Sequence, residues 1–148
     1  MWPTHWKLRM LWFPLLLCLL AGLLCSCSLW GGQKSNEEGL LAAADLFNTD
    51  VRWEDYKAAA ACIAPSDKAK FWNQVDRLQG RVRIMDYQVV DVELRDDGES
   101  GTVTLRYRFF YKNNPQIQTI TLRQQWIFSG KDRAWQVVEN DLQRLMAD

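Results

Sequence analysis

Histidine is almost absent from this chain. His5 is the only one in 148 residues, and it lies near the N-terminus. The closely spaced cysteines, Cys25 and Cys27, are one residue apart, which differs from the C-x-x-C spacing of redox and zinc sites. One histidine and such a pair cannot complete a four-ligand metal shell. We therefore expect neither a metal site nor a cofactor.

An excess of charge of either sign is also missing. The chain has 18 basic and 18 acidic side chains, and 16 basic ones remain when Lys7 and Arg9 near the N-terminus are set aside. These basic residues are interleaved with acids rather than clustered. Nucleic-acid binding needs a basic patch or stripe, so we expect no nucleic-acid partner.

A long hydrophobic run occurs once, from Leu11 to Leu24. It follows a cationic start, MWPTHWKLRM, and precedes the small and polar residues CSCS, which is the anatomy of a secretory signal peptide. As a helix the run would span about 21 Å, short of the roughly 30 Å hydrocarbon core of a bilayer. Pro14 also disfavours a permanent span. We expect residues 1–26 to be a cleaved signal peptide; an uncleaved N-terminal membrane anchor is the alternative.

The end of this run resembles the lipobox of bacterial lipoproteins, in which a leucine, a tolerant position and a small residue precede the modified cysteine. The matching residues are Leu24, Cys25, Ser26 and Cys27. The resemblance implies cleavage between Ser26 and Cys27, a diacylglyceryl group on the Cys27 sulfur and acylation of the new amino terminus. Several acyl chains hold a protein on a membrane where a single myristoyl chain is marginal. Ser28, where some lipoproteins have aspartate, implies the periplasmic face of the outer membrane if the host is Gram-negative.

After this cleavage the remaining cysteines are Cys27, which would carry the lipid, and Cys62. An internal disulfide could then not form. Cys62 lies in the alanine-rich stretch KAAAACIAP, and we interpret it as a small core residue rather than a nucleophile.

Residues 27–36 are rich in glycine and polar side chains, which predicts a flexible tether. Three helices are predicted between residues 37 and 80. The first has one apolar stripe and ends at residues 48–50, and the second is short and ends at Pro65. Ser66 is the expected N-cap of the third helix, and Gly80 takes the position after its C-terminus. The apolar positions of this third helix are Ala69, Phe71, Trp72, Val75 and Leu78.

From residue 81 onward the apolar period becomes two. Residues 102–111 and 119–128 alternate between apolar and polar side chains, so each predicts a strand with one face in the core. The links RDDGESG, KNNPQ and SGKDR favour hairpins, and the residues around Trp135 and Val137 would close an antiparallel meander. The expected inward set is Val103, Leu105, Tyr107, Phe109, Tyr111, Ile120, Leu122, Gln124, Trp126 and Phe128.

The first strand breaks this alternation. Val90, Val92 and Leu94 share one parity, whereas Met85, Tyr87 and Val89 share the other. A β-bulge near Val89 and Val90 would place both sets on one face and bend the sheet. The alternative is a strand covered on both faces.

This arrangement resembles the NTF2-like superfamily, the cystatin-like α+β cone. Three strings carry the resemblance: WEDYKAAAACIAPSDKAKFW as a helix pair, IMDYQVVDVEL as a long bent strand, and QQWIFSGKDRAWQVVEN as a final hairpin. It implies an α+β fold in which three N-terminal helices pack on a strongly bent antiparallel meander, over residues 37–148. Members include isomerases, dehydratases, polyketide cyclases and non-catalytic binding domains, so the fold leaves the function open.

The enzymes of this superfamily commonly use an aspartate with a histidine, or an aspartate base with a tyrosine. The mature chain has no histidine, so the first pattern is absent. For the second, Asp86 shares the parity of Val82 and Ile84, and Tyr107 lies on the expected inward face. The candidate pocket residues are Trp72, Asp86, Tyr107, Gln124 and Trp126.

Each polar candidate also has an ordinary structural interpretation. Gln124 could bond to a neighbouring backbone, Asp86 could lie outside the bulge in solvent, and Tyr107 could be a core residue. Arg106, Arg108 and Arg123 line the expected outer face of two strands, as a solvated face or a dimer contact.

We therefore expect a non-enzymatic, lipid-anchored envelope protein whose domain binds a small apolar ligand in its cone or a protein partner on its sheet. A homodimer is one form that such a partner could take. The alternatives are a small isomerase-like enzyme that uses Asp86 with Tyr107, and an assembly subunit of an envelope complex.

Overall fold

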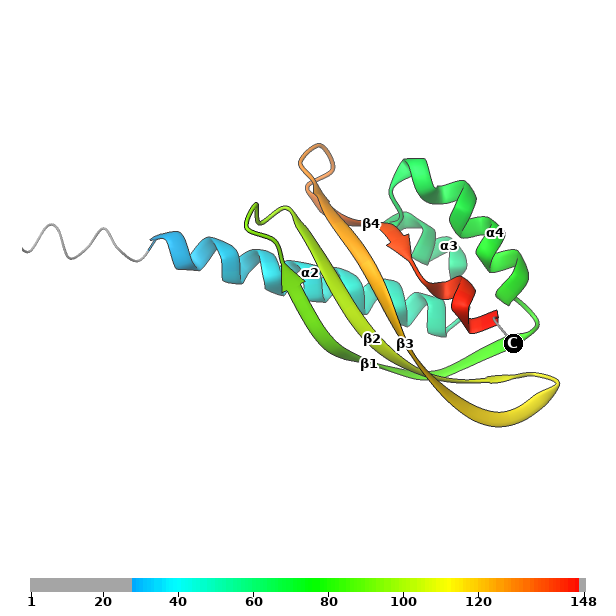
Figure 1. Ribbon diagram of the computed structural model, residues 1–148. Coiled ribbons are helices and arrows are strands. Elements are labelled where there is room, and N and C mark those ends of the chain that lie inside the picture. Colours follow the sequence, from blue (N-terminus) through cyan, green and yellow to red (C-terminus); the bar gives the residue numbers. More distant parts are fainter. Residues whose placement is uncertain (1–27, 147–148) are drawn as a thin grey trace, which may run out of the picture. The chain divides into compact units, whose positions relative to one another are not determined.

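Over residues 36–146, a four-stranded antiparallel sheet packs one face against the helices (Figure 1). The computed structural model describes residues 28–146, with side chains from residue 36. The elements are α2 (Ser28–Arg52), α3 (Tyr56–Ala59), α4 (Lys68–Leu78), β1 (Val82–Leu94), β2 (Ser100–Tyr111), β3 (Asn114–Ser129) and β4 (Ala134–Asn140), with 3-10 turns η1 (Ala60–Cys62), η2 (Pro65–Asp67) and η3 (Leu142–Met146). The strands follow the order β1-β2-β3-β4, so the predicted α+β meander is confirmed.

The apolar stripe of α2 runs further than the sequence pattern suggested. Leu40, Ala44, Phe47 and Val51 are all buried, and the helix continues to Arg52. The predicted stop at residues 48–50 is wrong, because Asn48 is a buried helical residue whose side chain bonds inside the molecule.

The start of α2 lies within residues 27–36, for which the composition predicts a flexible tether. The helix begins at Ser28 and includes Gly31 and Gly32. Each glycine costs about 1 kcal/mol relative to alanine in a helix, which is why the composition indicated a flexible segment. Helix propagation from residues already ordered is cheap compared with nucleation, so one long helix can include both glycines.

The two following helices begin with caps of different kinds. Asp55 is the N-cap of α3, and its carboxylate accepts a hydrogen bond from Ala58 N at 3.1 Å. The expected cap at Ser66 is wrong, because that residue lies in η2 and its Oγ donates to Asp67. Gly80 follows α4 with φ of +80°, as predicted for the residue beyond a helix C-terminus.

Two register shifts bend β1. One lies between Val89 and Asp91, which confirms the predicted bulge, and a second lies between Ile84 and Asp86. Each shift moves the following residues to the opposite parity. Three apolar pairs of different parity therefore share the inner face, namely Val82 with Ile84, Tyr87 with Val89, and Val92 with Leu94.

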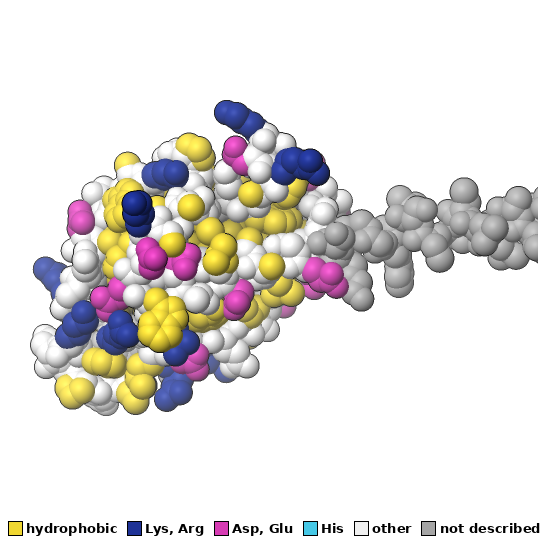
Figure 2. Space-filling model, turned by 180° about the vertical axis from the view of Figure 1, so that it is seen from behind, with side chains coloured by type: hydrophobic (Ala, Val, Ile, Leu, Met, Phe, Trp, Pro, Cys, Tyr) yellow, Lys and Arg dark blue, Asp and Glu magenta, His cyan; other side chains and the backbone are white. Residues whose placement is uncertain are grey.

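The core lies between the inner face of the sheet and the helices. The expected inward residues of β2 and β3 point into it, and Tyr111, Ile120 and Phe128 are partly buried at its margin. On the side of the molecule that Figure 2 shows, hydrophobic side chains lie in small groups among charged ones. The largest fully buried side chains of the core include Trp126, Tyr107, Phe47, Phe71, Leu40, Ile63, Leu105 and Leu122.

Candidate functional site

Three polar side chains meet in the interior, where the sequence predicted a pocket. Asn48 comes from α2, Tyr107 from β2 and Gln124 from β3, and each is at most 1% exposed. Gln124 Nε2 donates to Asn48 Oδ1 at 2.8 Å, and Asn48 Nδ2 donates to Gln124 Oε1 at 3.2 Å. Tyr107 donates its hydroxyl hydrogen to Asn48 Oδ1 and accepts from Gln124 Nε2 at 3.3 Å. We call these three residues the buried amide cluster.

The buried amide cluster leaves no polar atom of its own unpaired. The second donor position of Asn48 Nδ2 is used by the carbonyl of Ala44 at 2.6 Å. Burial raises the pKa of Tyr107 far above its usual value of 10.0, with a smaller contribution from Tyr87 and an opposing one from the Gln124 hydrogen bond. The hydroxyl therefore stays protonated and fixed as a donor, which is a structural role.

Trp126 closes the interior beside this cluster. It is 1% exposed, and its ring meets Phe47 edge to face with centroids 6.0 Å apart. Phe47 also packs on Phe71 from α4 at 6.0 Å. Aromatic rings therefore occupy part of the interior around Phe47.

Two predicted pocket residues do not join this group. Asp86 is exposed, pairs across the strands with Arg108, and its Oδ1 accepts a hydrogen bond from Tyr87 N. The parity argument that placed it inward fails because the bulge at Met85 reverses the facing of the next residues. The structure therefore places Asp86 on the outer face and Tyr107 inside.

Trp72, the other of these two residues, also lies outside the interior. It is 40% exposed on α4, where the buried positions are Phe71, Gln74, Val75 and Leu78. Trp72 is one position beyond Phe71, so it is rotated about 100° from it around the helix, and its ring packs on the outer edge of Phe71 instead.

Asn48 is not among the predicted site residues, because an asparagine near the end of an apolar stripe resembles a helix stop. A buried polar residue that shares a face with Ala44, Phe47 and Val51 could have indicated an interior partner.

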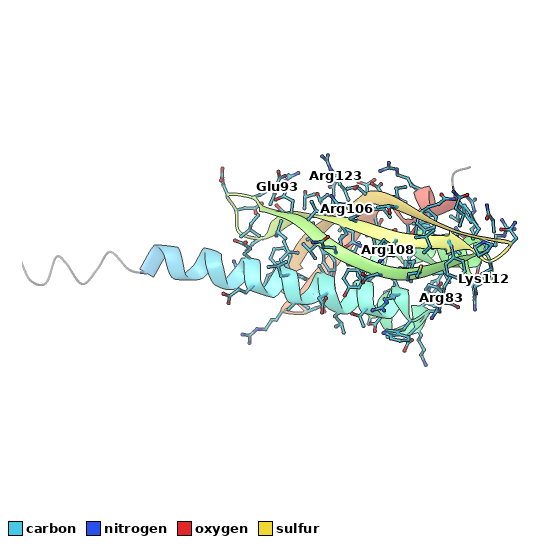
Figure 3. The ribbon with its side chains drawn as sticks, turned by 90° about the horizontal axis from the view of Figure 1, so that it is seen from below. Arg83, Glu93, Arg106, Arg108, Lys112 and Arg123 are labelled. Atoms are coloured by element: carbon cyan, nitrogen blue, oxygen red, sulfur yellow. The ribbon has the colours of Figure 1, made fainter. Side chains whose placement is uncertain are left out.

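The outer face of the sheet is polar and carries unpaired arginines. Arg106 and Arg108 are exposed on β2, and Arg123 is exposed on β3. Figure 3 shows these three residues on the side of the sheet away from α2. None of them forms an ion pair within 4.0 Å among the described residues. We call these three residues the arginine face.

The arginines lie close to one another. In the strand register, Arg106 pairs with Thr121, and Arg123 pairs with Thr104. The two arginines are therefore diagonal neighbours on adjacent strands, whose Cα atoms are typically about 7–8 Å apart. Arg108 follows Arg106 on the same face of β2 at about 7 Å.

Two other basic side chains, at one end of the sheet, are paired with an acid. Arg83 Nη1 lies 2.9 Å from Glu54 Oε1, and Lys112 Nζ lies 3.5 Å from the same oxygen. The hydrogen bond from Arg83 is the main reason why the pKa of Glu54 is lowered. These contacts join the turn after α2 to the start of β1 and the end of β2.

A pocket of about 640 Å³ lies at that end of the sheet, beside the β2–β3 turn. None of the predicted pocket residues lines it. Its walls come from the turn between α4 and β1, the β2–β3 hairpin and Met146.

The remaining predictions concern metal binding and the membrane. Among residues 28–146, no three His, Cys, Asp or Glu side chains gather as metal ligands. Within the same part of the chain, no helix combines the length and apolar character that a membrane crossing requires. The predicted signal peptide, the cleavage site at Ser26 and Cys27, and the lipid on Cys27 lie outside the described residues.

Comparisons with known proteins reveal the fold. No family model matches the chain, and no curated protein does either. Among solved structures, a ketosteroid isomerase-like protein from Erwinia carotovora atroseptica SCRI1043 matches with a TM-score of 0.57 and 14% identity, over 70% of this chain and 92% of the other.

Two further structures are similar at lower scores. One is a polyketide cyclase-type protein, so described in its own name, from Xanthomonas campestris pv. campestris, with a TM-score of 0.47 and 18% identity over 76% of this chain and 97% of the other. The other is a protein with a cystatin-like fold from Nostoc punctiforme PCC 73102, with a TM-score of 0.47 and 10% identity over 69% and 85%. At such identities the likeness is one of fold, and the match with a TM-score of 0.57 supports the α+β arrangement of helices on an antiparallel meander.

Proposed function

We propose that this protein is a non-enzymatic, lipid-anchored protein of the bacterial cell envelope that binds a protein partner through the outer face of its sheet. The observation that carries this proposal is the arginine face, three exposed guanidinium groups without ion-pair partners among the described residues.

The interior supports a binding role over a catalytic one. The buried amide cluster uses Tyr107 as a structural donor, and the carboxylate of Asp86 lies on the other face of the sheet. A general base has to reach the proton that it abstracts, and among the described residues the Tyr107 hydroxyl bonds to the amides of Asn48 and Gln124 rather than to a carboxylate. The isomerase-like alternative that pairs Asp86 with Tyr107 therefore lacks its geometry.

The outer face has the composition of a protein interface. The exposed side chains of β3 on this face combine the Arg123 guanidinium with apolar residues at both ends, Ile117 at 50% and Ile127 at 40% exposure. Arginine and apolar side chains are typical of interface centres. A guanidinium binds a carboxylate with two parallel hydrogen bonds, so the expected partner has acidic residues. The full exposed row is Ile117, Thr119, Thr121, Arg123, Gln125 and Ile127.

A polyanion fits this face less well. Asp86 and Asp91 on β1 are exposed beside the arginines, opposite Arg108 and Thr104 in the strand register. These acids would repel phosphates or sulfates along the same surface. A folded partner can match both signs of charge in register.

The anchor is supported by the resemblance of residues 24–27 to a lipobox. Cys27→Ala should leave the protein uncleaved and without lipid, and globomycin should cause the wild-type precursor to accumulate. Metabolic labelling with palmitate measures both effects. Cys62→Ala is the matched control, since it removes the other mature cysteine and should leave labelling unchanged. Labelled Cys27→Ala would contradict the anchor.

The partner is tested by photo-crosslinking in intact cells. A photoreactive residue at Thr121, between Arg106 and Arg123, should give a discrete adduct, whereas one at Lys70 on the exposed side of α4 should not give the same adduct. The double reversal Arg106→Glu and Arg123→Glu should reduce the adduct by at least about tenfold, because each charged hydrogen bond contributes about 1.5–3 kcal/mol. Lys68→Glu with Lys70→Glu is the charge-matched control. An adduct that is insensitive to the reversal, or that contains only a second copy of this chain, would contradict the proposal.

A further inference from the structure

The pocket at the end of the β2–β3 hairpin has a chemistry of its own. It lies near the end of the sheet at which Figure 3 labels Lys112, and its volume of about 640 Å³ is in the range of small-molecule sites, about 300–1,000 Å³. Polar side chains dominate its lining, which includes Arg81, Tyr111, Asn113, Asn114, Gln118 and Met146.

The backbone around this pocket is held in place. Arg81 O accepts a hydrogen bond from Lys112 N at 2.7 Å, and Val82 pairs with Tyr111. Across the hairpin, Tyr111 pairs with Asn114. The walls are therefore joined by main-chain bonds, so a ligand would meet a largely preformed site.

The amide side chains of the pocket have free hydrogen-bonding capacity. The side chains of Asn113 and Gln118 make no hydrogen bond among the described residues, and Asn114 uses only Oδ1, which accepts from Gln116 N at 3.3 Å. Each amide group can both donate and accept. These amides would be paired best by a ligand with several groups that can also both donate and accept a hydrogen bond, and hydroxyl groups can do both.

The remaining side chains narrow the ligand further. The ring of Tyr111 is half-exposed and is held against Phe109 in an edge-to-face contact with centroids 5.7 Å apart. The ring offers an apolar surface to an apolar face of a ligand. Arg81 contributes a positive charge, and no acid is among the described lining residues, so the site suits a neutral or carboxylated molecule.

We propose that this pocket binds a saccharide unit. Sugar hydroxyls match the three amides, and the C–H face of a pyranose ring matches the ring of Tyr111. A purely apolar ligand would leave the amides desolvated and unpaired, at a cost for each group. The pocket lies apart from the arginine face, so this inference does not depend on the protein partner.

Saturation-transfer NMR on the full lipidated protein in a detergent without sugar, such as dodecyl dimethylamine oxide, tests the proposal. The probes are triacetylchitotriose and maltotriose, and dodecanoate serves as the apolar comparison. At least one of the saccharides should receive saturation. Asn113→Ala and Gln118→Ala should each weaken its binding by about fivefold, the effect of one lost hydrogen bond.

Thr121→Ala, on the opposite face of the sheet, is the matched control and should bind like the wild type. Asn113 is exposed at the hairpin tip, so its substitution should leave the fold unchanged, and thermal unfolding checks this. Absence of saturation for both saccharides, equal saturation in Asn113→Ala, Gln118→Ala and the wild type, or pocket-dependent binding of dodecanoate alone would each overturn the proposal. Loss of the crosslinked partner after charge reversal, with saccharide binding unchanged, would separate the two sites.

Discussion

The buried amide cluster allows a stability prediction in which two single substitutions have unequal costs. Asn48→Leu removes the acceptor of the Tyr107 hydroxyl and the donor to Gln124 Oε1. The hydroxyl hydrogen of Tyr107 and the Oε1 atom of Gln124 then lose their buried partners, and each loss costs about 1–3 kcal/mol, so the free energy of unfolding should fall by about 2–6 kcal/mol. The carbonyl of Ala44 lies within a helix and keeps its backbone partner.

Tyr107→Phe should be much milder. Asn48 Oδ1 keeps the hydrogen bond from Gln124 Nε2 at 2.8 Å, and that nitrogen keeps Asn48 as its acceptor. No buried group is left without a partner, so the expected loss is about 1 kcal/mol.

The combined variant Asn48→Leu, Tyr107→Phe and Gln124→Leu completes the test. It removes all the polar groups of the cluster, so no unpaired atom remains, and it should be more stable than Asn48→Leu alone. Urea denaturation, followed by tryptophan fluorescence and circular dichroism, measures the free energies. The reasoning is refuted if Tyr107→Phe costs as much as Asn48→Leu, or if the combined variant is the least stable.

Gly101→Ala should destabilise the fold by about 1–3 kcal/mol, because the added Cβ would lie 2.7 Å from a core leucine and 2.9 Å from a β1 carbonyl oxygen. Gly130→Ala, with no atom within 4 Å, is its control, and equal melting temperatures would contradict this packing. Because the pKa of Glu54 is lowered from its usual value of 4.5, its charged form stabilises the fold at pH values above 4.5, and this stabilisation is lost as the pH falls through the lowered pKa. Glu54→Gln should remove that part of the pH dependence of stability in acid denaturation. An unchanged pH profile would exclude the Arg83 contact. Burial, with a smaller effect of a nearby carboxylate, raises the pKa of Cys62, so its alkylation by iodoacetamide at neutral pH should be slower than that of free cysteine, and an equal rate would contradict its placement.

The fold was predictable where a single period runs uninterrupted. On β2 and β3 the alternation from Val103 to Phe109 and from Leu122 to Trp126 placed each side chain on its observed face. Hairpin links rich in Gly, Asn, Asp and Pro then fixed the meander order.

The prediction failed where one residue changes the period or the exposure. The bulge at Met85 has no sequence signal of its own, and it reverses the facing of Asp86. The apolar side chain of Trp72 indicated a buried position. Trp72 lies one position beyond Phe71, outside the buried stripe of α4, and is therefore exposed.

The polar features depend on contacts that are distant in the sequence. Asn48 and Gln124 are 76 positions apart, and only the packing of α2 on β3 brings their amides together. The hairpin pocket likewise joins Arg81 with Gln118 through strand pairing. Local patterns contain no information on either contact.

The central claim is that this domain is held at a membrane by a lipid on Cys27. Intact-mass spectrometry of the protein extracted from membranes tests it most directly. We expect a chain that begins at Cys27 and carries the mass of a diacylglyceryl group and an N-acyl chain. A chain that retains Met1, or one that begins near residue 27 without lipid, would contradict it.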